Sequence, residues 1–137
     1  MKLLVVADSA HTWPQDGEGR YTLQPLVRRF RPDALISLGD FSAVHATAMA
    51  HAGAPFSAGV YGNHCTQDYM PSSGLVDLVG DRELPARRGT LRLPGHRELS
   101  VLAVQGCVRY KPDIDDVLFT QDEYAAAIAA IPAAELV

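Results

Sequence analysis

The chain has 137 residues, of which 47% are hydrophobic and 20% are charged, and its formal net charge is −4. This composition is typical of one globular domain, and an acidic chain without a basic cluster is a poor candidate for non-specific binding to nucleic acid or an anionic membrane. Cys65 and Cys107 are too few for a disulfide framework. The apolar run at the start of the sequence is too short for a signal peptide or a membrane span, so we expect a cytoplasmic protein with reduced thiols.

The first half of the chain predicts three buried strands that alternate with two helices. Residues 2–7, 34–38 and 55–61 are apolar runs of the kind that forms parallel strands covered on both faces. Residues 23–30 carry apolar side chains at helical spacing, and residues 42–52 form an alanine-rich segment that begins with a capping serine. This alternation predicts a parallel sheet with right-handed crossovers, in which the three strand ends lie at one edge.

The second half of the chain has a different pattern. Residues 75–79 suggest a short helix, and residues 89–93 and 99–104 read as an antiparallel pair joined by a turn at 94–96. Residues 120–131 predict a last alanine-rich helix that ends before a proline. The fold class we predict is therefore α/β, a layered fold with a mixed, largely parallel β-sheet.

Each strand of the expected parallel sheet ends in residues that are poor strand formers but good ligands. Asp8, with His11 close behind, follows the first strand, Gly39-Asp40 follows the second, and Gly62-Asn63-His64 follows the third. Open α/β sheets place their chemistry at the carboxyl ends of their strands, so these oxygen and nitrogen donors indicate a metal site. Each also has a structural alternative, because Asp8 could cap a loop, Asp40 could cap a helix and Asn63 could form a turn.

The strings "VVAD", "PDALISLGDF" and "PFSAGVYGNHC", in this order, resemble the calcineurin-like metallophosphoesterases. Those proteins carry D-x-H, G-D and G-N-H motifs at successive strand ends. The resemblance implies hydrolysis of a phosphomonoester or phosphodiester by a water that two divalent ions activate, and the mixed donors favour Mn, Fe, Zn or Ni. It assigns Asp8, His11, Asp40 and Asn63 to the metals, with Asp40 as the bridge, and His64 to the active-site histidine that faces the phosphoryl oxygens and helps the leaving group depart.

The chain departs from the family pattern in two ways. Position 10 is Ala10, so the histidine of the first motif comes one residue late, as His11, and its role as a ligand stays open. The family's further histidines, a lone His and a G-H-x-H motif, would follow residue 137, and the Gly95-His96 pair falls in an expected turn and lacks the second histidine. The resemblance therefore implies an incomplete metallophosphoesterase-like sandwich, a single domain over residues 1–137 that is truncated at its C-terminus.

This departure leaves a second function open. The chain could be a catalytically incomplete remnant or an interaction domain of the same fold, whose site is completed by a second copy or by a complementing chain. A sheet that lacks strands would leave an exposed edge and an uncovered apolar face, and both favour association.

Other polar and aromatic residues have simpler interpretations. We expect His45 and His51 at the surface or the boundary of their helix, and Trp13 and Tyr21 in packing rather than in a substrate pocket. The cluster of Arg109, Tyr110 and Lys111 favours a solvated loop over a phosphate contact, and Asp113, Asp115 and Asp116 show no metal-binding spacing.

Overall fold

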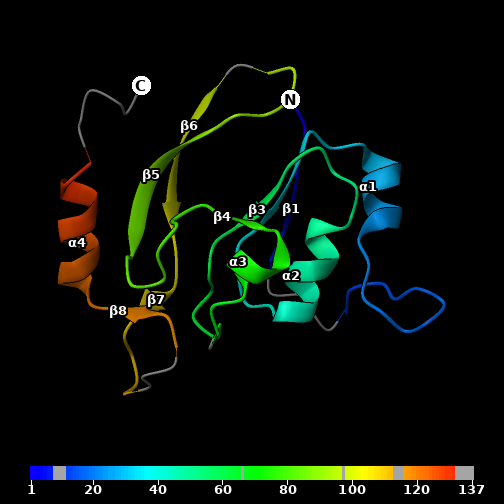
Figure 1. Ribbon diagram of the computed structural model, residues 1–137. Coiled ribbons are helices and arrows are strands. Elements are labelled where there is room, and N and C mark those ends of the chain that lie inside the picture. The colour runs from blue at the N-terminus through cyan, green and yellow to red at the C-terminus, as the bar shows by residue number, and fades with distance from the viewer. Residues whose placement is uncertain (8–11, 66, 97, 113–115, 132–137) are drawn as a thin grey trace.

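A four-stranded parallel sheet lies at the centre of the protein, in the order β1-β2-β3-β4. The computed structural model describes residues 1–7, 12–65, 67–96, 98–112 and 116–131 (Figure 1). The strands are β1 (Leu3–Val6), β2 (Ala34–Ser37), β3 (Ser57–Gly59) and β4 (Val76–Asp77). The helices between them are α1 (Gln24–Phe30), α2 (Ala43–Ala50) and α3 (Met70–Ser73). The α/β class predicted from the sequence is confirmed, and this sheet is parallel throughout.

The two faces of the sheet are covered by different kinds of element. Leu35 belongs to one apolar core with Val27 of α1, Met49 of α2 and Met70 of α3. On the opposite face, Ile36 and Ala58 pack with residues that belong to or adjoin the ends of an antiparallel hairpin, formed by β5 (Ala86–Leu91) and β6 (Leu99–Val104). The protein is therefore layered, with α1, α2 and α3 on one side of the parallel sheet and the hairpin on the other (Figure 1).

The register of the parallel strands fixes which residues meet at the carboxyl edge. Val6 pairs with Ser37, and Ser37 pairs with Gly59. Asp40 and Asn63 come three and four residues beyond this line of pairing. The strand ends after β2 and β3 therefore lie side by side, at the lower edge of the sheet in Figure 1.

Local chemistry explains where the longer helices begin. Ser42 and His45 form a reciprocal capping box at the start of α2, and Thr120 and Glu123 form another at the start of α4 (Gln121–Ala129). Such boxes satisfy backbone N–H groups that have no partner within the helix. The predicted helices at residues 42–52 and 120–131 are confirmed, with slightly shorter bounds.

The structure corrects two predictions about strands. Leu3 and Val5 are 45% and 49% exposed, because β1 lies at the edge of the sheet and the hairpin packs on β2 and β3 instead. The prediction of a strand covered on both faces is therefore wrong for β1, and holds for β2. The short helix predicted at residues 75–79 is also wrong, since Val76 and Asp77 pair with β3 as a strand.

The last part of the chain returns from the hairpin to the edge of the main sheet. Gln105, which is 2% exposed, donates from Nε2 to the carbonyl oxygens of Asp81 at 2.8 Å and Leu84 at 2.7 Å. After it, β7 (Cys107–Val108) pairs in parallel with β8 (Leu118–Phe119), and α4 follows. Within the described ranges, no helix has the length and apolar character that crossing a membrane requires.

Candidate functional site

Two glycines allow the loops after β2 and β3 to touch. A Cβ on Gly62 would lie 2.6 Å from Cγ of Asp40, and closer still to Oδ1 and the backbone nitrogen of Asp40. A Cβ on Gly39 would lie 2.9 Å from the carbonyl carbon of Tyr61 and closer still to the backbone of Gly62. Real Cβ atoms essentially never come within 3.0 Å of such neighbours. Gly39 also has φ +98°, in the left-handed region that favours glycine.

Asp40 is held in a strained conformation against the next strand end. Its φ of 56° is left-handed, which is uncommon for a residue other than glycine, although aspartate tolerates it better than most. Its Oδ1 accepts a hydrogen bond of 3.0 Å from the backbone N–H of His64. Strain of this kind is concentrated at functional sites, where surrounding contacts hold the residue in place.

Cys65 fixes the turn that carries Asn63 and His64. Its backbone N–H donates to the carbonyl of Gly62 at 3.2 Å, and its Sγ accepts from the backbone N–H of Gly62 at 3.2 Å. The same sulfur lies 2.9 Å from the hydroxyl of Tyr69 and donates to the carbonyl of Phe41 at 3.7 Å. These contacts link the turn after β3 to the loop after β2. Because Cys65 is also only 1% exposed, its thiol has a structural role.

A segment from the second half of the chain completes this edge. Gly106 donates its backbone N–H to the carbonyl of Tyr61 at 2.8 Å, and Val117 donates to the carbonyl of Asn63 at 3.2 Å. Next to Val117, Asp116 has a side chain that is only 5% exposed. Its Oδ2 lies 2.5 Å from Nζ of Lys111 and 3.9 Å from Nδ1 of His64.

The thiol of Cys107 responds to the charges gathered at this edge. Burial is the largest cause that raises the pKa of this thiol, and the carboxylates of Asp40 and Asp116 raise it further. Lys111 acts in the opposite direction. Two carboxylates and one ammonium group are therefore near enough to Cys107 to affect the pKa of its thiol.

The structure brings together three of the five residues predicted for the site. Asp40, Asn63 and His64 share the carboxyl edge, as the sequence predicts. Asp8 and His11 lie outside the described residues. In the part of the chain that is described, no group of three or more His, Cys, Asp or Glu side chains is arranged to hold a metal ion.

The donor atoms of Asp40 and Asn63 suit a divalent cation. Oδ1 of Asp40 accepts from the backbone N–H of His64, and the backbone carbonyl of Asn63 accepts from Val117. Carboxylate and amide oxygens are hard donors that bind divalent ions. Metal binding by Asp40 and Asn63 therefore stays a prediction.

Asp116 and Lys111 are the residues of this edge that sequence reasoning missed. Both lie more than 45 positions after His64, so no local motif connects them to it. The only signal was the density of charged residues over 109–116. Residues 109–111 lie in a loop, as predicted, and Lys111 pairs there with the buried carboxylate of Asp116.

The histidines of α2 behave differently from one another. His45 is 7% exposed, and its ring packs against Trp13 at 5.0 Å and Tyr21 at 4.2 Å between centroids. The prediction of a surface position is wrong for His45, because its Nδ1 serves the cap of α2, 2.8 Å from the Ser42 hydroxyl, while the rings cover it. The predicted surface position is confirmed for His51, which is exposed. The predicted packing role of Trp13, which is 8% exposed, is also confirmed.

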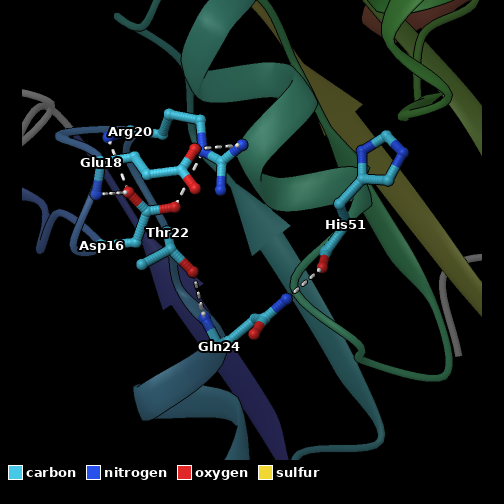
Figure 2. A network of polar contacts seen from close by, with 6 residues as sticks. All are labelled: Asp16, Glu18, Arg20, Thr22, Gln24 and His51. Carbon is cyan, nitrogen blue, oxygen red and sulfur yellow. Dashed lines mark hydrogen bonds and ion pairs between the residues drawn. The ribbon is translucent and has the colours of Figure 1, made fainter.

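A groove of about 760 Å³ lies between residues 16–24 and α2. Asp16 shapes its wall by accepting from the backbone N–H groups of Glu18 and Arg20 and, at 2.9 Å, from Nε of Arg20 (Figure 2). The backbone N–H of Arg20 is the largest cause that lowers the pKa of Asp16. These polar groups bind one another, and Asp40, Asn63 and His64 are not among the residues that line the groove.

Comparison with known proteins gives no further guide to the chemistry of this edge. No protein-family model, no curated protein and no solved structure matches the chain.

Proposed function

We propose that the protein is a metal-dependent phosphoesterase, which hydrolyses a phosphomonoester or phosphodiester on a metallophosphoesterase-like sandwich. The observation that supports this most strongly is the contact between the loops Gly39-Asp40 and Gly62-Asn63-His64. It joins a carboxylate, an amide and an imidazole at the carboxyl edge of a parallel sheet, where such folds place their chemistry.

Asp40 and Asn63 would hold the cations, with Asp8 and His11 as the further candidates. Divalent ions bound there would neutralise charge on the phosphoryl oxygens and lower the pKa of the attacking water. Mn, Fe, Zn or Ni suit the mixed donors, and two ions would need an anionic bridge to offset their mutual repulsion. Asp40 supplies that charge, and its hydrogen bond from His64 orients the carboxylate before any ion arrives.

His64 is placed to act on the substrate itself. Its backbone is fixed to Asp40, yet its side chain is 61% exposed. An imidazole can donate a proton near neutral pH, which suits transfer to the leaving-group oxygen. His64 would therefore contact the phosphoryl group and assist the departure of the alcohol.

Hydrolysis of p-nitrophenyl phosphate and of its bis-ester, with and without Mn²⁺, tests this function. We expect Mn²⁺-dependent turnover that His64→Ala lowers by about 10²–10⁴-fold, the usual contribution of a general acid. His51→Ala is the matched control, because His51 is an exposed histidine at the C-cap of helix α2. Circular dichroism would verify that both variants fold. Turnover that does not depend on Mn²⁺, or that is unchanged in His64→Ala, would overturn the proposal.

One observation favours the second candidate, a catalytically incomplete domain that needs a partner chain. β1 is an edge strand, and Leu3 and Val5 expose nearly half of their side chains on one face of it. Such an edge can pair with another copy or with a complementing chain. Absence of metal binding in calorimetry, together with a self-associated species in light scattering, would support this candidate over the first.

A further inference from the structure

We infer that the groove between residues 16–24 and α2 is a binding site for a small primary amine with an apolar body, whose ammonium group lies at the C-terminal end of α2. Asp40, Asn63 and His64 are not among the residues that line this groove. Amine binding is therefore independent of the proposed phosphoester hydrolysis, and either can be absent without the other.

The groove follows one face of α2 over its whole length. Its lining residues on that side recur at helical spacing and are Ala43, Val44, Thr47, Ala48 and His51. At a rise of about 1.5 Å per residue, this face is about 12 Å long. The volume of about 760 Å³ is within the range of pockets that hold small ligands. Val44 is 61% exposed, so the groove presents apolar surface that the body of a ligand would cover.

The opposite wall of the groove is held in place by its own contacts. Asp16 accepts hydrogen bonds from the backbone N–H groups of Glu18 at 2.9 Å and Arg20 at 3.0 Å, which close the loop on itself. Tyr21 is fixed to α2 because its ring lies 4.2 Å, between centroids, from the ring of His45. A preformed groove reduces the entropic cost of ordering the protein around a ligand.

The C-terminal end of α2 presents an acceptor and a negative partial charge. Nδ1 of His51 lies 2.8 Å from the carbonyl oxygen of Thr47, which can only accept, so Nδ1 carries the proton of the neutral ring. Nε2 of His51 is then an acceptor. Carbonyl groups at the end of a helix add partial negative charge, and the last turn of α2, which the structure describes in full, contains no basic side chain that would offset it. This end of the groove therefore favours a head group that donates hydrogen bonds and is positively charged.

Charged side chains of the loop also favour a cation over an anion. Among the described residues that line the groove, Arg20 is the one with a formal positive charge. Its Nε lies 2.9 Å from Oδ2 of Asp16, and its Nη1 lies 3.0 Å from Oε2 of Glu18 (Figure 2). Two carboxylates outweigh one guanidinium group, so a carboxylate or phosphate head would meet net negative charge. An ammonium group is the head that both this loop and the end of α2 favour.

Three six-carbon ligands that differ only in their heads test the chemistry of the ligand. Hexylamine, hexanol and hexanoate would each be titrated into the nitrogen-15-labelled full chain and followed by NMR, at a pH above the ordinary histidine pKa of about 6.5. We expect saturable shifts of the backbone signals of Val44, Thr47 and His51 with hexylamine. Hexanol should bind about tenfold more weakly, because a hydrogen bond from a charged donor is stronger than one from a neutral donor, and hexanoate more weakly still.

Lysine blocked at both ends distinguishes a free amine from a lysine side chain of a partner protein. It carries the same ammonium group, but peptide groups replace the apolar tail, so we expect it to bind more weakly than hexylamine. Tighter binding of the blocked lysine would overturn the assignment to a small amine.

Two variants test where the ligand lies. Val44→Lys places a second ammonium group at the groove, and we expect it to abolish hexylamine binding. Leu102→Lys is the matched control and should bind as the wild type does, because it adds the same charge at a 44% exposed residue of β6 that does not line the groove. His51→Leu should remove the preference for hexylamine over hexanol. Absence of saturable hexylamine binding, equal affinity for the three ligands, or binding that Val44→Lys leaves unchanged would overturn the inference.

Discussion

Replacing Gly62 with alanine tests the contact on which the site depends. The new Cβ would lie 2.6 Å from Cγ of Asp40, whereas ordinary contacts begin near 3.4 Å. Either Asp40 or the backbone of the turn must therefore move, because the atoms closest to the new methyl group include the backbone nitrogen of Asp40. The movement would also displace the hydrogen bond from His64 to Oδ1.

Overpacking of this kind costs about 1–3 kcal/mol of unfolding free energy. For a domain of this size, that corresponds to a fall in Tm of roughly 3–12 °C. Thermal unfolding followed by circular dichroism measures the fall, and the same variant should lose Mn²⁺-dependent hydrolysis.

Gly17→Ala is the matched control for Gly62→Ala. A Cβ on Gly17 would meet no atom within 4 Å, and the backbone of Gly17 is not in the left-handed region. It should leave both Tm and turnover unchanged. A Gly62→Ala protein as stable as the wild type would show that the two loops do not touch. That result would contradict the site, which depends on this contact.

Three further predictions concern the rest of the fold. Thr120→Ala should lower stability in urea denaturation by about 1 kcal/mol, because the hydroxyl of Thr120 accepts from the backbone N–H of Glu123 at the start of α4; an unchanged midpoint would contradict the cap. The backbone N–H of Lys2 is the largest cause that lowers the pKa of Asp33, and the side chain of His96 lowers it further. Ionised Asp33 therefore stabilises the folded state above the unfolded carboxyl pKa, near 3.9, and this stabilisation is lost as the pH falls through the lower folded value. Urea midpoints across this acid range should therefore fall less steeply in Asp33→Asn, and equal slopes would contradict the pairing. Val5→Lys should leave the monomer folded and remove any self-association seen in light scattering, since Val5 is 49% exposed on the edge strand; self-association that persists would locate the contact elsewhere.

The elements that the sequence predicts well are those with local signals. Ser42 and Thr120 mark helix starts by their own chemistry, and the turn at Pro94-Gly95 marks the hairpin. β4 escaped prediction because a short apolar run fits a helix as well as a strand, and its pairing with β3 decides between them.

The difference between local signals and long-range contacts also explains which parts of the site could be predicted. Asp40 and His64 follow neighbouring parallel strands, so the order of the strands alone places them at one edge. Asp116 and Lys111 reach that edge through hydrogen bonds between distant backbone segments, which no spacing in the sequence records. His45 is buried because rings from the preceding loop cover the cap of its helix, and this too depends on long-range packing.

Titration of the full chain with Mn²⁺ in an isothermal calorimeter tests the central proposal most directly. We expect saturable binding that approaches two ions per chain, and its loss in Asp40→Ala, while Asp16→Ala, a carboxylate of the separate groove, binds as the wild type does. Absence of saturable binding, or identical isotherms for the wild type and Asp40→Ala, would contradict a metal site at this edge of the sheet.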